Sequence, residues 1–193
     1  GAHVLKKMLD KGYQVSVFAR SPEKLDMTNE HLTVIKGNAN DASLVDQAMP
    51  GHDIVISCLG SNTGLGKSTE LHKMASNIAN SMKKHGVKRI IYVASAGIDK
   101  EIPGMMGKIT MKLLGNVLED HRNAVQAIKD AELCWTIVRP LGLNDKTATL
   151  AYRETEEGIP QNGRSISRED VADFIMRAAE DEKYQYKSVA ISD

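Results

Sequence analysis

The feature that most constrains the fold is a regular alternation of short apolar runs with helical patterns. The runs are rich in Val and Ile, and they are Gln14–Ala19, Leu32–Lys36, Asp53–Leu59, Arg89–Ala94, Trp135–Arg139 and Lys187–Ile191. Largely apolar runs of this length are typical of parallel strands that helices cover on both faces, because neither face meets water. The alternation predicts a three-layer α/β/α domain built on a Rossmann-like, doubly wound parallel sheet.

Two of the intervening segments show the helical pattern most clearly. Apolar residues recur at helical spacing from Leu71 to Met82, and the predicted helix ends at His85–Gly86 after a basic last turn. Ser167 stands before acidic residues and an apolar periodic run, which predicts a capped amphipathic helix. No repeat or linker divides the 193 residues, so we expect one domain, 1–193.

The amino-terminal segment departs from this alternation. Gly1 leads directly into a predicted helix, Ala2–Gly12, with no strand before it. In dinucleotide-binding folds a central strand precedes this helix, and its turn carries the glycines that approach the pyrophosphate. We therefore expect this strand and most of the glycine-rich turn to lie before Gly1, which would be the last glycine of that turn.

A basic cluster follows the first apolar run. Arg20 comes about 20 residues after Gly1, where NAD-specific folds place an acid that bonds the ribose hydroxyls. A guanidinium pairs with phosphate instead, so Arg20, with Ser21 and Lys24, predicts the 2′-phosphate of NADP. The alternative interpretation is a solvated arginine at the start of a loop.

A second possible phosphate site is Ser61–Ser68, which resembles the P-loop pattern G-x-x-x-x-G-K-[ST]. Ser61 occupies the first glycine position, however, and Gly60 is one place out of register. A Gly- and Ser-rich loop beside the adenine of a dinucleotide is the favoured interpretation.

Charge and cysteine content give no indication of a nucleic-acid, membrane or metal-binding function. Lys plus Arg and Asp plus Glu number 25 each, so no excess of positive charge favours nucleic acid or an anionic membrane. Cys58 and Cys134 lie far apart without metal-ligand spacing, which predicts reduced thiols, a cytoplasmic location and no metal. No apolar stretch is long enough to span a bilayer.

Four ordered motifs carry a resemblance to a known family. They are VSVFAR-SPEKL (15–25), VIKGNANDASLVDQAMPGHDIVISCLGS (34–61), HGVKRIIYVASAG (85–97) and CWTIVRP (134–140). Together they resemble the atypical short-chain dehydrogenase/reductases of the NAD(P)H-binding, NmrA-like group, over nearly the whole chain. The four motifs in this order indicate the family far more specifically than any one motif does.

The resemblance implies where a dinucleotide would lie. Two segments are expected to border the adenosine: Gly37, Asn38 and Ala39, and Leu59, Gly60 and Ser61. Two others are expected to border the nicotinamide: Ala94 and Ser95, and Pro140 and Leu141. The chain departs from the family pattern at Asn38, where an Asp is usual. This departure is expected to loosen a contact with adenine.

The chemical step is less well specified than the cofactor. Ordinary short-chain dehydrogenases use a Tyr and a Lys four residues later, and no such pair occurs in the helix expected after Ser95. A flavin-reducing member of the family also lacks the pair and has Ser and His at the positions of Ser95 and His121. These two are our candidate catalytic residues, although a strand-end hydroxyl and a histidine on a solvated helix face are the structural alternatives.

Two functions remain open. One is an NADPH-dependent oxidoreductase that transfers hydride to a flat acceptor such as a flavin or quinone. The other is an NADP(H)-sensing regulator without turnover, which reports to a protein partner. The Met- and Gly-rich segment Ile102–Gly115 is either a lid over the acceptor or a loop and helix packed on the core.

Overall fold

A mostly parallel sheet lies between two layers of helices in the computed structural model, which describes residues 1–61 and 64–193, apart from the side chain of Met106. The principal strands are β1 (Val15–Ala19), β2 (Leu32–Lys36), β3 (Ile54–Ser57), β4 (Arg89–Val93), β5 (Cys134–Pro140) and β9 (Lys187–Ser192). Three short strands complete the set: β6 (Gly142–Asn144), β7 (Arg153–Thr155) and β8 (Ser165–Ser167). The predicted α/β fold is confirmed.

The strands form three hydrogen-bonded groups. Five of them follow the order β3-β4-β5-β9-β7, in which only β7 runs antiparallel to its neighbour. β1 and β2 form a separate parallel pair, and so do β6 and β8. Within the described residues, β1 has no strand partner other than β2, and β3 has none other than β4. A break therefore separates β1 from β3.

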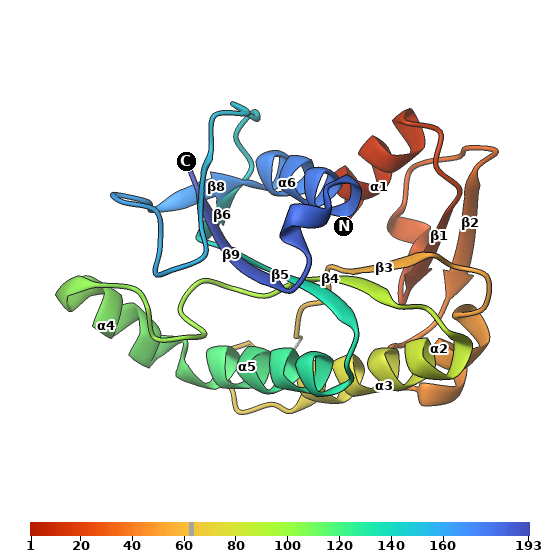
Figure 1. The fold of residues 1–193 in the computed structure, drawn as a ribbon, viewed down its shortest axis with the longest axis horizontal. Helices are drawn as coiled ribbons and strands as arrows, with labels where there is room; N and C mark the ends of the chain where they lie inside the picture. The colour runs from red at the N-terminus through yellow and green to blue at the C-terminus, as the bar shows by residue number, and fades with distance from the viewer. Residues whose placement is uncertain (62–63) are drawn as a thin grey trace.

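The helices cover both faces of the sheet (Figure 1). One layer holds α2 (Ala42–Ala48), α3 (Glu70–His85) and α5 (Gly115–Asp130), and the other holds α1 (Ala2–Asp10) and α6 (Arg168–Glu180). α4 (Gly104–Leu113) projects from the body of the molecule ahead of α5. Among the helices that the structure describes, none combines the length and apolar character needed to cross a membrane.

Local sequence explains where the two best-predicted helices begin and end. α3 ends at Gly86, whose φ of +75° is a left-handed conformation that favours glycine, as predicted. α6 begins after Ser167, whose Oγ accepts a hydrogen bond from the backbone N–H of Asp170 at 2.9 Å. Both boundaries agree with the sequence pattern.

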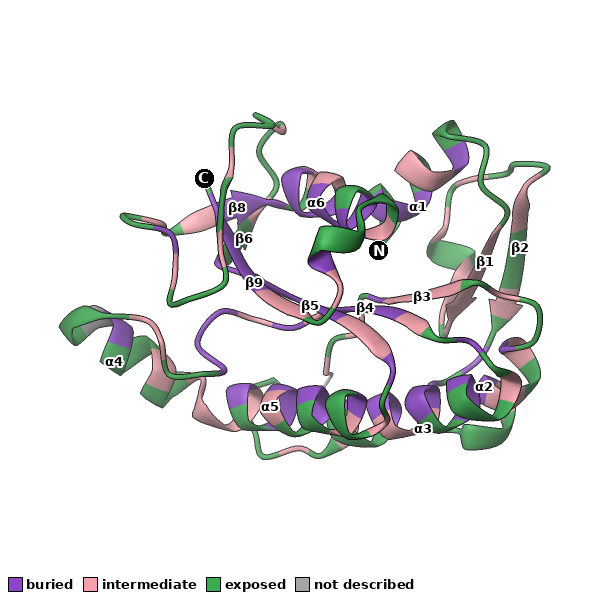
Figure 2. Cartoon of the chain, viewed as in Figure 1, coloured by how far each residue is buried: buried purple, intermediate pink, exposed green. Residues whose placement is uncertain are grey.

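Two apolar cores lie on the two sides of the sheet (Figure 2). One, between the sheet and α2, α3 and α5, includes Met82, Ile90 and Ile128. The other, between the sheet and α1 and α6, includes Val138, Phe174 and Ile191. These cores hold β4 and β5 in the middle of the molecule.

Candidate functional site

The carboxyl ends of β1, β2 and β3 converge on Glu70, the first residue of α3. Arg20, directly after β1, has its Nη1 atom 3.8 Å from Glu70 Oε1. Asn40, from the loop after β2, donates from Nδ2 to the same oxygen at 3.1 Å. Ser61, from the loop after β3, donates from Oγ to Glu70 Oε2 at 3.2 Å. Three segments that are distant in sequence therefore meet at one carboxylate.

The predicted phosphate-binding residues lie together at this edge. Arg20 is 41% exposed and Lys24 is also exposed, so both cations reach solvent. Ser21 is half-buried and directly precedes a short 3₁₀ helix, Pro22–Lys24, in which the N–H of Lys24 donates to Ser21 O at 3.2 Å. The turn therefore places the three residues at the end of β1 and leaves the charges of Arg20 and Lys24 exposed.

The loop after β2 begins with a glycine that packs against Phe18. A Cβ added to Gly37 would lie 2.3 Å from ring atoms of Phe18, so a larger residue there would displace the ring. Asn38 is exposed, and its Oδ1 accepts the N–H of Asn40 at 3.0 Å, which makes an Asx turn. Ala39 is buried, and its carbonyl accepts from Asn77 Nδ2 at 2.9 Å. An asparagine at position 38 therefore performs the turn-forming role of an aspartate without its charge.

Gly1, expected near the pyrophosphate, stands at the amino end of α1, and Leu59 and Gly60, expected near the adenosine, follow β3. Gly1 caps α1 without a side-chain hydrogen bond, and a Cβ added to it would lie 3.9 Å from Cys58 Cβ, just beyond β3. Leu59 is half-buried and Gly60 is exposed. The amino end of α1 thus opens beside the carboxyl end of β3.

The residues expected near the nicotinamide lie at the ends of β4 and β5. The N–H of Ala94 donates to Val138 O at 2.8 Å and the N–H of Ala96 donates to Pro140 O at 3.0 Å, so the two chains stay adjacent beyond β4. Ser95 lies between them, half-buried, and its Oγ donates to Ala96 O at 3.0 Å. Pro140 and Leu141 are buried.

His121 belongs to the interior of α5 rather than to an open cleft. It is buried, and its Nδ1 lies 3.3 Å from the hydroxyl of Tyr92, a buried residue of β4. Burial lowers the pKa of the imidazole from 6.5 to about 4, against the opposing effect of the Asp120 carboxylate. His121 is therefore neutral at pH 7. His121 contacts Tyr92, and the Ser95 hydroxyl donates to Ala96. Within the described part of the chain, no hydrogen bond joins the two candidates.

Arg139 is a buried arginine that was not predicted as a site residue, and its contacts stabilise the segments at the carboxyl ends of β4 and β5. Arg139 is 2% exposed, and its Nη1 donates to Glu101 Oε1 at 2.5 Å. Its Nη2 donates to the carbonyls of Glu156 and Ser188 at 2.8 and 3.3 Å. Glu101 in turn accepts the N–H of Gly97 at 3.0 Å. The Arg139–Glu101 pair therefore connects the segment after Ser95 to β5. The sequence signal for Arg139 was a charged residue inside an apolar strand.

Two further acids were also missed. Glu70 stands just before the predicted helical pattern and was not named as a site residue. Asp120, which is 1% exposed, accepts the backbone N–H groups of Leu71 and His72 at 3.1 and 3.0 Å. Asp120 thus caps α3 from α5.

The P-loop-like segment, Ser61–Ser68, includes residues 62 and 63, which lie outside the described part of the chain.

Comparison with known proteins identifies similar sequences and similar solved structures. The chain is 32% identical over 117 residues to sanguinarine reductase from Eschscholzia californica, which covers 58% of the chain and 41% of that protein. It superposes with a TM-score of 0.81 and 29% identity on a Rossmann-fold NAD(P)-binding protein from Shigella flexneri, covering 100% of this chain and 87% of that one.

A third neighbour has a low sequence identity and therefore shows only that the fold is shared. It is a short-chain dehydrogenase/reductase from Veillonella parvula, crystallised in complex with NADP, with a TM-score of 0.85 and 21% identity over 100% of this chain and 88% of that one. The family described as NAD(P)H-binding matches residues 1–182, which is most of the chain. This protein belongs to the NAD(P)H-binding family.

Proposed function

We propose that the protein is an NADPH-dependent reductase that transfers hydride to a flat acceptor such as a flavin or quinone. The observation that carries the proposal is the cluster of Arg20, Ser21 and Lys24 at the carboxyl end of β1, in a chain of the NAD(P)H-binding family. Two cations and a hydroxyl form a donor set suited to a phosphate monoester. The amino end of α1, where the N-cap is Gly1 and no described side chain bonds the backbone, adds N–H groups that suit a pyrophosphate.

The residues of this chain would bind and orient the dinucleotide. When bound, the reduced nicotinamide supplies the hydride. Arg20 would exchange its ion pair with Glu70 for the 2′-phosphate, and Ser95 would hydrogen-bond the nicotinamide amide or the acceptor. His121, held neutral by burial beside the Tyr92 hydroxyl, would not serve as a charged acid. The remaining proposed cofactor contacts are Gly1, Gly37, Asn38, Ala39, Leu59, Gly60, Ser61, Ala94, Pro140 and Leu141.

The acceptor class is supported by α4 and by the resemblance to biliverdin reductase B, a flavin reductase. α4 exposes an apolar stripe at helical spacing, Met105, Ile109 and Leu113, and Met105 is 79% exposed. Flexible apolar side chains of this kind adapt to flat aromatic ligands. They support the lid hypothesis for Ile102–Gly115. The free cysteines Cys58 and Cys134 support the cytoplasm as the compartment.

The second candidate is an NADP(H) sensor of the NmrA-like type. The neutral, buried state of His121 favours it, because no charged acid then stands in for the missing Tyr/Lys pair. Such a protein would bind the dinucleotide and report it to a protein partner.

An oxidation assay distinguishes the two. The purified protein is incubated with NADPH and, in turn, FMN and a water-soluble quinone, while NADPH binding is measured separately by titration. Sustained NADPH oxidation that depends on both protein and acceptor is expected. Binding without turnover over the whole panel would support the sensor, and absence of NADPH binding would contradict both.

A further inference from the structure

A buried ion pair stands beside the segment that follows β4. The side chains of Arg139 and Glu101 are 2% and 8% exposed, and they are joined by the bond from Nη1 to Oε1 at 2.5 Å. Taking two charges out of water costs free energy that their attraction often does not repay, so apolar residues of similar size are often as stable. Arg139 Nε, which has no hydrogen-bond partner among the described residues, adds to this cost. Stability alone therefore does not explain a charge pair at this place.

The Glu101 carboxylate holds a turn of the chain just after β4. Its Oε1 accepts the N–H of Gly97 at 3.0 Å, and its Oε2 accepts the N–H of Asp99 at 2.9 Å. The N–H of Lys100 donates to Gly97 O at 3.0 Å, which closes the turn. Glu101 therefore bonds two backbone donors of this turn while Arg139 fixes the carboxylate from β5.

A second arginine holds the same turn from α5. Arg122 Nε donates to Ile98 O at 2.6 Å, and Ile98 is 1% exposed. The turn is also closely packed, because a Cβ added to Gly97, whose φ is +96°, would lie 3.2 Å from side-chain atoms of Ile102 and Leu118. The backbone of the turn is thus fixed from β5 and from α5 at once.

The anchored turn lies between Ser95 and α4. On its amino side the N–H of Ala96, the residue next to Ser95, donates to Pro140 O at 3.0 Å. On its carboxyl side the chain continues through Pro103 into α4, which projects from the body of the molecule (Figure 1). A fixed turn therefore determines both where the Ser95 hydroxyl lies and where α4 begins.

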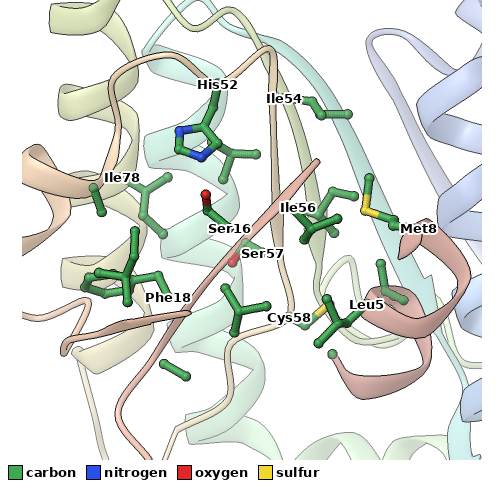
Figure 3. Close-up of a pocket in the computed structure, with 18 of the residues that line it drawn as sticks. Leu5, Met8, Ser16, Phe18, His52, Ile54, Ile56, Ser57, Cys58 and Ile78 are labelled. Atoms are coloured by element: carbon green, nitrogen blue, oxygen red, sulfur yellow. The ribbon is translucent and has the colours of Figure 1, made fainter. Parts of the chain in front are cut away.

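The buried pair lies apart from the residues proposed to bind the phosphates. A cavity of about 1070 Å³ lies between β1 and β3, and Figure 3 shows Phe18 and Cys58 in its wall. The proposed phosphate contacts Gly1 and Arg20 line this cavity, and neither member of the buried pair does. A change in the pair should therefore affect the carboxyl ends of β4 and β5 rather than the phosphate contacts.

We infer that Glu101 is a positioning residue for transfer to the acceptor, and this inference rests on the proposed reductase function. Clamped by Arg139, its carboxylate keeps the turn in one geometry, and the turn keeps the Ser95 hydroxyl and the start of α4 in place beside the acceptor. A misplacement of about 1 Å in such a support can lower a rate by about a hundredfold. The pair therefore controls turnover and leaves dinucleotide affinity nearly unchanged.

The test compares turnover with NADPH affinity in Glu101→Gln, whose amide loses the charge and one of the two acceptor oxygens. Steady-state rates are measured with whichever of FMN and the water-soluble quinone the wild type reduces, and NADPH is titrated separately. We expect kcat/KM for the acceptor to fall about ten- to a hundredfold, with the Kd for NADPH nearly unchanged. Hydrogen exchange at the Gly97 and Asp99 amides should become faster, with Ile90 as an internal reference.

Three further variants complete the comparison. Arg122→Met removes the anchor from α5 and should give a smaller loss in the same direction, and it decides the test if Glu101→Gln does not fold. Glu180→Gln makes the same substitution in the exposed pair with Lys11 and should keep the turnover of the wild type. Ile128→Ala opens a cavity in the core of α5, so it lowers stability without touching the turn, and it should also keep that turnover well below its melting temperature.

Unchanged turnover or unchanged exchange in Glu101→Gln would overturn the inference alone, and so would a loss of equal size in Ile128→Ala. NADPH affinity that falls in step with turnover would also overturn it, because the pair would then act on the dinucleotide site as a whole. If Glu101→Gln does not fold, unchanged turnover in Arg122→Met has the same meaning. A wild type that oxidises NADPH with neither acceptor would overturn the reductase proposal and this inference with it.

Discussion

Ser95 stands just beyond β4 with its hydroxyl bonded to the adjacent carbonyl of Ala96. We expect Ser95→Ala to lower turnover by up to about tenfold, because one positioned hydrogen bond contributes about 0.5 to 1.5 kcal/mol. NADPH affinity should change little. The matched control is Ser76→Ala, which removes a similar hydroxyl-to-carbonyl bond on the exposed face of α3. Steady-state rates and NADPH titration check this, and an unchanged rate in Ser95→Ala removes Ser95 from the mechanism.

His121 should make stability depend on pH. Its pKa of about 4 in the folded protein lies below the ordinary 6.5, so the unfolded chain binds more protons between these values. The stabilisation is therefore complete above pH 6.5 and is lost as pH falls toward 4. The expected loss is on the order of 3 kcal/mol, and urea unfolding at pH 7 and pH 4.5 measures most of it.

The pH dependence of unfolding is compared between the wild type and two variants. His121→Asn should flatten this part of the profile, whereas His3→Asn, on the exposed surface of α1, should leave it unchanged. An acid loss of equal size in the wild type and in His121→Asn would show that other groups cause it.

At the scale of elements, the Arg139–Glu101 pair links β5 to the segment that leads into α4. Breaking a buried pair from one side leaves an uncompensated charge, so Glu101→Gln and Arg139→Met should each be strongly destabilising. A double-mutant cycle should give a coupling energy of about 1 to 3 kcal/mol. The exposed pair Arg168–Asp145, at 2.7 Å, should give less than about 1 kcal/mol. Equal coupling in the two cycles, measured by denaturant unfolding, would contradict the role of Arg139.

The elements that periodicity specifies were predictable. Leu32–Lys36 was predicted with the observed bounds of β2, and the other long strands agree within two residues at either end. β6, β7 and β8 were not predicted, because three residues carry no periodic signal and two of these strands lie partly in solvent. α4 was expected only as part of a loop and helix, and its apolar stripe faces outward rather than toward a core.

At the scale of the whole molecule, the candidate site was only partly predictable. Arg20 could be found from its distance in sequence to Gly1 and its place after a strand. Glu70 could not, because it lies fifty residues after Arg20 and only the fold brings the carboxyl ends of β1, β2 and β3 to α3. The burial of His121 could not be predicted either, because its charged neighbours in sequence are typical of an exposed helix face.

The most direct test of the central claim is a titration of NADPH and NADH against the wild type, Arg20→Ala and Glu70→Gln at low and moderate salt. A charge-assisted bond to the 2′-phosphate predicts that NADPH binds about ten- to a hundredfold more tightly than NADH, with the preference decreasing as salt rises. Arg20→Ala should remove this preference and leave NADH binding nearly unchanged, and Glu70→Gln, which releases Arg20 from its ion pair, should increase it. Equal affinity of the wild type for the two dinucleotides, or an Arg20→Ala variant that loses both alike, would contradict the account.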